Sequence, residues 1–216
     1  GERERVLLSQ PDGTYKNVQL PFSARAHGGS AVDMTGSGYA DIVYTDFNGR
    51  GRPFYMVNNG NGTFTEDASR LSATSTANKA IWSAEFIDVN NDGRYDLWFA
   101  GTYKKGAPES YWQAVYYNTG LNVFSDVRSR SYEPPVDDSS PMDVLYRNNT
   151  LYTLNVSDSY TSVSVTSTSV ADGTVANLYT HSGLYGSTGS GWFYWMIFNG
   201  PNILSSEAVF SVSFKY

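Results

Sequence analysis

The chain has 216 residues and no cysteine, and its 21 acidic residues outnumber 15 basic ones for a net charge of −6 at pH 7. The lack of cysteine excludes disulfides, thiol nucleophiles and cysteine-rich zinc sites. The scattered basic residues disfavour nucleic acid as a partner, and no run of about 18 apolar residues predicts a transmembrane segment. Abundant tyrosine, glycine and β-branched residues favour strands and turns, so an all-β fold is predicted.

A polar turn followed by an aromatic residue recurs three times in the first 127 residues. The three stretches are SQPDGTYKNV (9–18), VNNGNGTFTED (57–67) and YNTGLNVFSDV (117–127). Asn, Asp and Gly tolerate the positive φ angles that tight hairpin turns require, so each stretch predicts a hairpin.

Two acidic loops also repeat along the chain. SAVDMTGSGYADIVYTD (30–46) aligns with AEFIDVNNDGRYDLWFA (84–100), so that each carboxylate at the ends of one loop has its counterpart 55 residues later. A hairpin, an irregular connection and an acidic loop that leads into a strand make a cassette of about 50 residues. That rhythm is typical of β-propeller blades. No segment has a convincing helical period, so helices are expected to be minor.

The pattern loosens after residue 135, which divides the chain into a repeat region (1–135) and a C-terminal β-rich region (136–216). MDVLYRNNTLYTLNV (142–156) predicts a strand, a turn at Asn148 and Asn149, and a second strand. The alternation in EAVFSVSFKY (207–216) predicts another strand. The C-terminal region is interpreted either as degenerate blades or as a small separate sandwich.

The second acidic loop has the donor pattern of a calcium site. Calcium prefers six to eight oxygen ligands, and alternate positions of one loop can wrap around it. The candidate ligands are the side chains of Asp88, Asn90, Asp92 and Asp96, with the carbonyl oxygen of Arg94. Gly93 permits the sharp turn. The chain has Phe99 where an EF-hand needs a glutamate, and the flanking sequence predicts a strand, so the EF-hand interpretation fails.

FIDVNNDGRYDLWFAG (86–101) and MVNNGNGTFTED (56–67) resemble the FG-GAP and VCBS repeats, the blades of integrin-type propellers, bacterial surface proteins and fungal lectins. The resemblance covers about residues 5–130. It implies a β-propeller-like fold in which the Asp88–Asp96 loop binds Ca²⁺. It does not imply one function, because such blades serve adhesion, sugar binding and accessory roles beside enzymes.

The first acidic loop departs from this pattern. Its candidate ligands are Asp33, Thr35, Ser37, Asp41 and the carbonyl oxygen of Tyr39. Two carboxylates neutralise a divalent ion less well than three. The first site is therefore expected to be weaker than the second, or empty.

No catalytic constellation emerges from the sequence. His27 and His181 are isolated, and no nucleophile motif accompanies them. The adjacent acids Asp137 and Asp138 are interpreted as a solvated loop. Aromatic residues are the candidates for stacking on a sugar ring, but cores of blades are also built from aromatics. The five tryptophans are Trp82, Trp98, Trp112, Trp192 and Trp195.

The sequence favours an extracellular or cell-surface module that is stabilised by Ca²⁺ and recognises a glycan or protein without catalysis. Two alternatives stay open: a carbohydrate-active enzyme or its accessory domain, and a structural subunit of a surface or toxin assembly. Because propellers have four to eight blades, a partner chain or oligomer is a further expectation for closing the ring.

Overall fold

The computed structural model describes residues 3–20, 22–23, 26–46, 51–72, 74–135, 139–157 and 162–182. These residues form an all-β protein with sixteen strands and two single 3₁₀ turns, η1 (Thr74–Thr76) and η2 (Asp126–Arg128). The all-β prediction is therefore confirmed. The predicted strand at 207–216, together with Asp137, Asp138, Trp192 and Trp195, lies outside the described residues.

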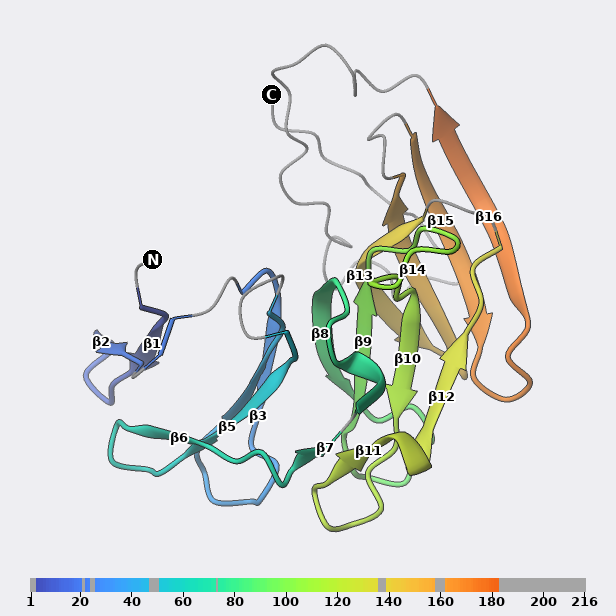
Figure 1. Ribbon diagram of the computed structural model, residues 1–216. Coiled ribbons are helices and arrows are strands. Elements are labelled where there is room, and N and C mark those ends of the chain that lie inside the picture. The colour runs from blue at the N-terminus through green and yellow to red at the C-terminus, as the bar shows by residue number, and fades with distance from the viewer. Residues whose placement is uncertain are drawn as a thin grey trace. The chain divides into compact units, whose positions relative to one another are not determined.

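The chain divides into two compact units. The first comprises residues 1–99 and 115–130, and the second comprises residues 100–114 and 131–216. Figure 1 labels their strands along the chain. The predicted division into 1–135 and 136–216 stays a prediction.

The first blade lies wholly within the first unit. Its strands are β3 (Gly29–Val32), β4 (Asp41–Tyr44), β5 (Phe54–Asn58) and β6 (Phe64–Glu66). They form an antiparallel meander in the order β3-β4-β5-β6. The first acidic loop connects β3 to β4, and the predicted turn NNGNGT connects β5 to β6. Leu20, Ile42, Phe54, Met56 and Phe64 form the buried cluster that holds this blade together.

The second blade repeats this order. It consists of β8 (Ile81–Ile87), β9 (Asp96–Gly101), β10 (Gln113–Tyr116) and β12 (Ser129–Tyr132), paired in the order β8-β9-β10-β12. Every residue of β9 and β10 is buried, so both faces of these strands are covered. The alternation in YWQAVYY (111–117) predicts that at least one face of this stretch is buried, and the structure buries both faces of β10.

The inner strands of the two blades lie against each other. The Ser30 hydroxyl in β3 donates a hydrogen bond to Glu85 Oε2 in β8 at 2.9 Å, and the Phe86 N–H donates to Ser30 Oγ at 3.2 Å. Backbones come close here, since a Cβ on Gly28 would stand 2.4 Å from the carbonyl oxygen of Trp82. Adjacent inner strands are the arrangement that neighbouring propeller blades adopt.

Two short strands tie the end of the first blade to the outer part of the second. β7 (Leu71–Ser72) runs parallel to β11 (Phe124–Ser125). Phe124 and Leu71 are buried partners in this register. The outer strand of blade 2 is therefore interrupted, with β11 pairing with β7 and β12 completing the sheet.

The β1–β2 hairpin precedes the first blade. β1 (Arg5–Ser9) and β2 (Tyr15–Gln19) pair antiparallel, and Val6 and Leu8 pack with Phe22 on the cluster of the first blade. The exposed side of the hairpin carries Leu7 and Tyr15.

The same type of Asx-Gly-Thr turn occurs in three hairpins. In each, the Thr N–H donates a hydrogen bond to the Asp or Asn side chain two residues earlier, at 2.9, 3.0 and 2.8 Å. The pairs are Thr14 with Asp12, Thr63 with Asn61, and Thr174 with Asp172. The intervening glycines adopt φ between +80° and +83°, which is costly for other residues. The third copy of this turn lies in the second unit.

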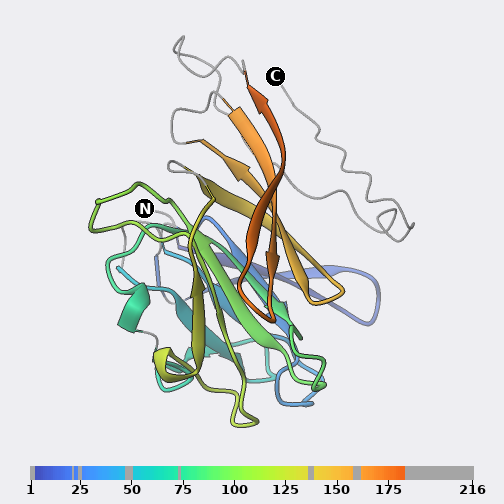
Figure 2. The ribbon, with the colours of Figure 1, turned by 90° about the vertical axis from the view of Figure 1, so that its right-hand side faces the viewer.

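The second unit contains a four-stranded antiparallel meander. Its strands are β13 (Ser140–Arg147), β14 (Thr150–Val156), β15 (Ser162–Ser169) and β16 (Val175–Ser182). The predicted turn is confirmed, with φ of +49° at Asn148 and +58° at Asn149. Figure 2 shows the twist of this sheet, with β16 in orange. The strand order β13-β14-β15-β16 is the same sequential order as in blade 1.

Candidate metal centre

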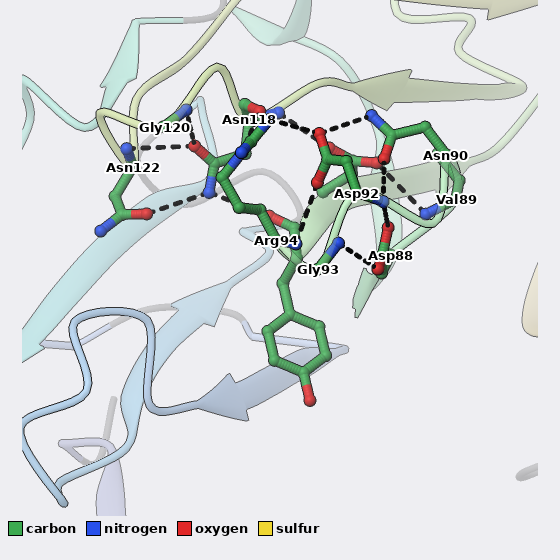
Figure 3. A network of polar contacts seen from close by, with 11 residues as sticks. Asp88, Val89, Asn90, Asp92, Gly93, Arg94, Asn118, Gly120 and Asn122 are labelled. Atoms are coloured by element: carbon green, nitrogen blue, oxygen red, sulfur yellow. Dashed lines mark hydrogen bonds and ion pairs between the residues drawn. The ribbon is translucent and has the colours of Figure 1, made fainter.

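The second acidic loop, Asp88–Asp96, connects β8 to β9, and hydrogen bonds from its own backbone fix its conformation. Asp88 accepts hydrogen bonds from the N–H groups of Asp92 at 3.1 Å and Gly93 at 2.9 Å, one on each carboxylate oxygen. Gly93 has φ of +80° and Asn91 has φ of +57°. The chain thus curls around the Asp88 carboxylate, as Figure 3 shows. Positive φ explains why glycine stands at the sixth position of the loop.

Asp92 lies at the exposed side of this curl. Its Oδ1 accepts the Arg94 N–H at 2.9 Å, and its Oδ2 is 2.5 Å from Arg94 Nη2 and 3.1 Å from Asn90 Nδ2. The Arg94 guanidinium therefore pairs with Asp92, the exposed carboxylate of the loop.

Asp96 is buried at the end of the loop. Its side chain accepts the N–H of Val89 at 3.2 Å and the N–H of Asn118 at 2.8 Å. Burial, together with the charges of Asp92 and Asp88, raises the pKa of Asp96 to about 6, even though both hydrogen bonds act in the opposite direction. The charges of Asp92 and Asp88 thus each disfavour the ionised form of Asp96.

The donor chemistry of this loop fits calcium. All five candidate ligands offer oxygen, and each carboxylate oxygen of Asp88 and Asp96 accepts one N–H and keeps a second lone pair. Among the described residues, no group of three Asp, Glu, His or Cys side chains already converges as a metal cluster. In the conformation seen, backbone N–H groups donate hydrogen bonds to the three carboxylates, and Arg94 pairs with Asp92. Asp88, Asn90, Asp92, Asp96 and the Arg94 carbonyl would hold the ion, and this assignment stays a prediction.

The first acidic loop, Asp33–Asp41, repeats the backbone of the second but has a different interior. Asp33 accepts the N–H groups of Ser37 at 2.9 Å and Gly38 at 2.6 Å, and these bonds lower the pKa of Asp33. The Ser37 hydroxyl lies 3.3 Å from both Asp33 Oδ1 and the Tyr39 carbonyl oxygen. It thus contacts two of the predicted ligand atoms, and the expected weakness of this site stays a prediction.

A buried aspartate closes both loops in the same way. Asp41 Oδ1 accepts the Asn58 N–H at 2.9 Å, as Asp96 accepts the Asn118 N–H. Asn58 Nδ2 then donates to the Ala40 carbonyl at 3.1 Å, and Asn118 Nδ2 donates to the Tyr95 carbonyl at 3.2 Å. Each Asn Oδ1 accepts the N–H of the glycine two residues later at 3.0 Å.

These two asparagines were not predicted as site residues. Sequence reasoning assigned them to hairpin turns, where Asn already has a local explanation. The available signal was their position, since Asn58 ends β5 and Asn118 lies two residues after β10, and they lie 17 and 22 residues after the aspartate that they bind. The asparagines join each acidic loop to the outer hairpin of its blade.

The remaining candidates do not join this site. His27 is exposed by surface area although its ring packs against Trp82, with the ring centroids 4.4 Å apart, and His181 is exposed on β16. Trp98 and Trp112 are buried, so they belong to the core. The half-exposed aromatics near the acidic loops are instead Tyr39, at 49%, and Tyr95, at 44%.

The fold and the loops define a protein built from propeller-type blades. The comparison with family models agrees, because residues 33–99 match the family described as an FG-GAP-like repeat. This match spans both acidic loops and strands β4 to β6 of the first blade. The stretch is therefore an FG-GAP-like repeat, and the predicted resemblance is confirmed there.

The similar solved structures include an exo-β-1,3-galactanase from Phanerochaete chrysosporium. A structure with β-1,3-galactotriose matches with a TM-score of 0.50 and 11% identity, over 84% of this chain and 42% of the galactanase chain. A structure of the same enzyme with galactose gives a TM-score of 0.46 and 12% identity, over 83% and 43%. The present chain thus spans less than half of the galactanase, and the likeness is one of fold. No curated protein sequence matches the chain.

The described part of the chain contains no helix with the length and apolar character needed to cross a membrane.

Proposed function

We propose that this chain is a Ca²⁺-stabilised recognition module that binds a glycan or protein at an extracellular or cell surface and carries out no chemistry. The bound ion would act as a structural staple in the Asp88–Asp96 loop. Adhesion and lectin-like binding are the roles that this proposal covers.

The charge of the loop carries the proposal. Asp88, Asp92 and Asp96 lie within one another's field, and Arg94 is the cation paired with Asp92. When all three acids are ionised, the loop keeps a net charge of −2, which a divalent cation neutralises. Calcium rather than zinc fits a donor set made entirely of oxygen.

The position of the loop explains why such an ion would stabilise the blade. The loop joins β8 to β9, and its last aspartate is bonded to Asn118 in the turn after β10. Bound calcium supplies positive charge that cancels the repulsion among the carboxylates. It would therefore favour the ionised form of the buried Asp96 and strengthen the connection between the inner and outer strands of blade 2.

Recognition is supported by the aromatic residues of the two loops. Tyr39 and Tyr95 are half-exposed and each lies within one of the acidic loops, two residues and one residue before the closing aspartate. An aromatic face can stack on the C–H face of a sugar ring while polar neighbours bind its hydroxyls. A glycan is thus a suitable ligand for this surface. β-1,3-Galactan is an inexpensive first member of a glycan screen, because the galactanase shares the fold.

A partner chain or second copy that completes the ring of blades is part of the same proposal. Multi-angle light scattering of the purified chain tests it, since a monomeric mass would remove this part.

Isothermal titration calorimetry with CaCl₂ tests the ion. The wild-type chain should bind Ca²⁺ and Asp92→Ala should not, while Glu109→Gln, an exposed acid outside the loops, should bind like the wild type. A glycan and protein array probed with the Ca²⁺-loaded chain then tests recognition, with Tyr39→Ala and Tyr95→Ala as the variants expected to lose signal. Calcium binding without any ligand, or hydrolysis of a bound glycan, would overturn the recognition role.

A further inference from the structure

The outer turn of blade 2 contacts both acidic loops. Asn118 begins this turn and is bonded to Asp96 of the second loop. Asn122 ends it, and its Nδ2 donates a hydrogen bond to the carbonyl oxygen of Met34 at 3.0 Å. Met34 follows Asp33 in the first loop. One turn of five residues therefore bridges two loops that are 55 residues apart in sequence.

The two asparagines are bonded to each other as well. Asn122 N–H donates to Asn118 Oδ1 at 3.1 Å, and Asn118 Nδ2 donates to Asn122 Oδ1 at 2.9 Å. Figure 3 shows this pair beside the second loop. Reciprocal bonds leave both side chains few alternative rotamers, so a displacement of Asp96 is passed to Asn122.

The equivalent position in blade 1 is a glycine. Asn58 and Gly60 correspond to Asn118 and Gly120, so Gly62 corresponds to Asn122. Both residues have positive φ, +83° at Gly62 and +53° at Asn122. The two turns therefore have a similar backbone conformation. Only in blade 2 does this position carry a side chain that contacts the neighbouring blade.

We propose that Asn118 and Asn122 form a strap that transmits the order of the Asp88–Asp96 loop to the Asp33–Asp41 loop. Calcium in the second loop would then stabilise the first loop, whether or not the first binds an ion of its own. Only the effect of calcium on the first loop depends on the proposed calcium site; the mechanical link between the two loops does not.

The contact with Met34 explains how the strap acts. A hydrogen bond to this carbonyl fixes the peptide between the first two residues after Asp33, where the loop begins to curl. The curl itself is held by the bonds from Ser37 and Gly38 to Asp33. A second contact runs from Arg70 Nη1 to the Asn122 carbonyl at 3.4 Å, and it does not involve the Asn122 side chain.

Amide hydrogen exchange of the full chain, read on peptides that cover 33–41 and 88–96, tests the strap. Asn122→Gly removes the side chain and keeps the backbone conformation of Gly62. Asn122→Asp keeps the acceptor for Asn118 but loses the donor to Met34. Leu121→Ala is the control, since Leu121 is a highly exposed neighbour in the same turn.

Calcium should slow exchange in both loops of the wild type and of Leu121→Ala. In Asn122→Gly and Asn122→Asp it should slow only the second loop, and exchange of the first loop should be roughly fivefold faster than in the wild type, the effect of losing about one hydrogen bond. Equal protection of the first loop in wild type and both variants would overturn the strap, and would point to an independent ion or to the Arg70 contact.

Failure of the calcium site gives a different result. If calorimetry detects no binding, the proposed function fails, and the strap is then tested without metal by loosening the second loop with Asp88→Ala. Exchange at 33–41 should rise in the wild-type background and rise less in the Asn122→Gly background. Equal increases in both backgrounds would overturn the inference on its own.

Discussion

Asp96 and Asn118 are joined by a 2.8 Å hydrogen bond from the Asn118 backbone N–H to Asp96 Oδ1, deep in blade 2. The other carboxylate oxygen accepts the Val89 N–H. Both carboxylate oxygens of Asp96 thus accept a backbone N–H. An asparagine here would have to place its NH₂ group, which only donates, against one of these two N–H groups.

Asp96→Asn should therefore destabilise the chain even in a chelator. One buried N–H would lose its acceptor, at a cost of about 2 kcal/mol in the free energy of unfolding. Urea denaturation in EGTA measures this cost. Asp92→Asn is the matched control, because Asp92 is more exposed and should cost much less without metal. Similar losses in the two variants would contradict the special role of the buried acid.

Tyr55 should stabilise the first blade as the partners of Asp96 stabilise the second. Its hydroxyl donates to Asp41 Oδ2 at 2.8 Å, and both residues are buried. Tyr55→Phe leaves that oxygen without this donor, and a hydrogen bond to a charged group contributes about 2 kcal/mol. Urea denaturation should detect the loss, whereas Tyr95→Phe at the half-exposed position should change stability by less than about 0.5 kcal/mol.

Ser37→Asp should strengthen the first loop as a calcium site. It places a third carboxylate where the Ser37 hydroxyl now contacts Asp33 and the Tyr39 carbonyl. Calorimetry should show the stoichiometry rise from about one ion per chain toward about two. Ser37→Ala removes the hydroxyl without adding charge and should not raise it. An unchanged stoichiometry in Ser37→Asp would show that charge is not what limits this loop.

His27 predicts a pH dependence of stability. Desolvation of the ring against Trp82 lowers the pKa of His27, and the charge of Asp46 opposes this only in part. Below an unfolded pKa of about 6.5, the unfolded chain then binds more protons than the folded chain, so this residue makes stability fall as the pH falls. Denaturation at pH 7.5 and pH 5.5 should show a larger loss in the wild type than in His27→Gln. Parallel curves would contradict the desolvation of a neutral imidazole.

The sequence predicted what depends on local spacing. The acidic loops and the turn at Asn148 could be predicted because Asp, Asn and Gly favour turns through local effects. Their side chains bond backbone groups a few residues away, or they accept positive φ. The FG-GAP-like repeat was recognised from the same motifs and is confirmed over 33–99.

What the sequence did not predict depends on distant partners. Asn118 binds an aspartate 22 residues away, and Asn122 binds a carbonyl 88 residues away. Neither contact produces a recognisable periodicity or motif in the sequence. Likewise, the complete burial of β9 and β10 depends on which elements cover them, which alternation along one strand cannot indicate.

If calcium staples the Asp88–Asp96 loop, the ion should raise the thermal stability of the chain. The most direct test compares the thermal midpoint of the wild-type chain and of Asp92→Ala, each with calcium and with EGTA. The account predicts that calcium raises the midpoint of the wild type by several degrees and leaves that of the variant unchanged. Equal midpoints of the wild type in calcium and EGTA would contradict it, and the loop would then be a turn held by its own hydrogen bonds.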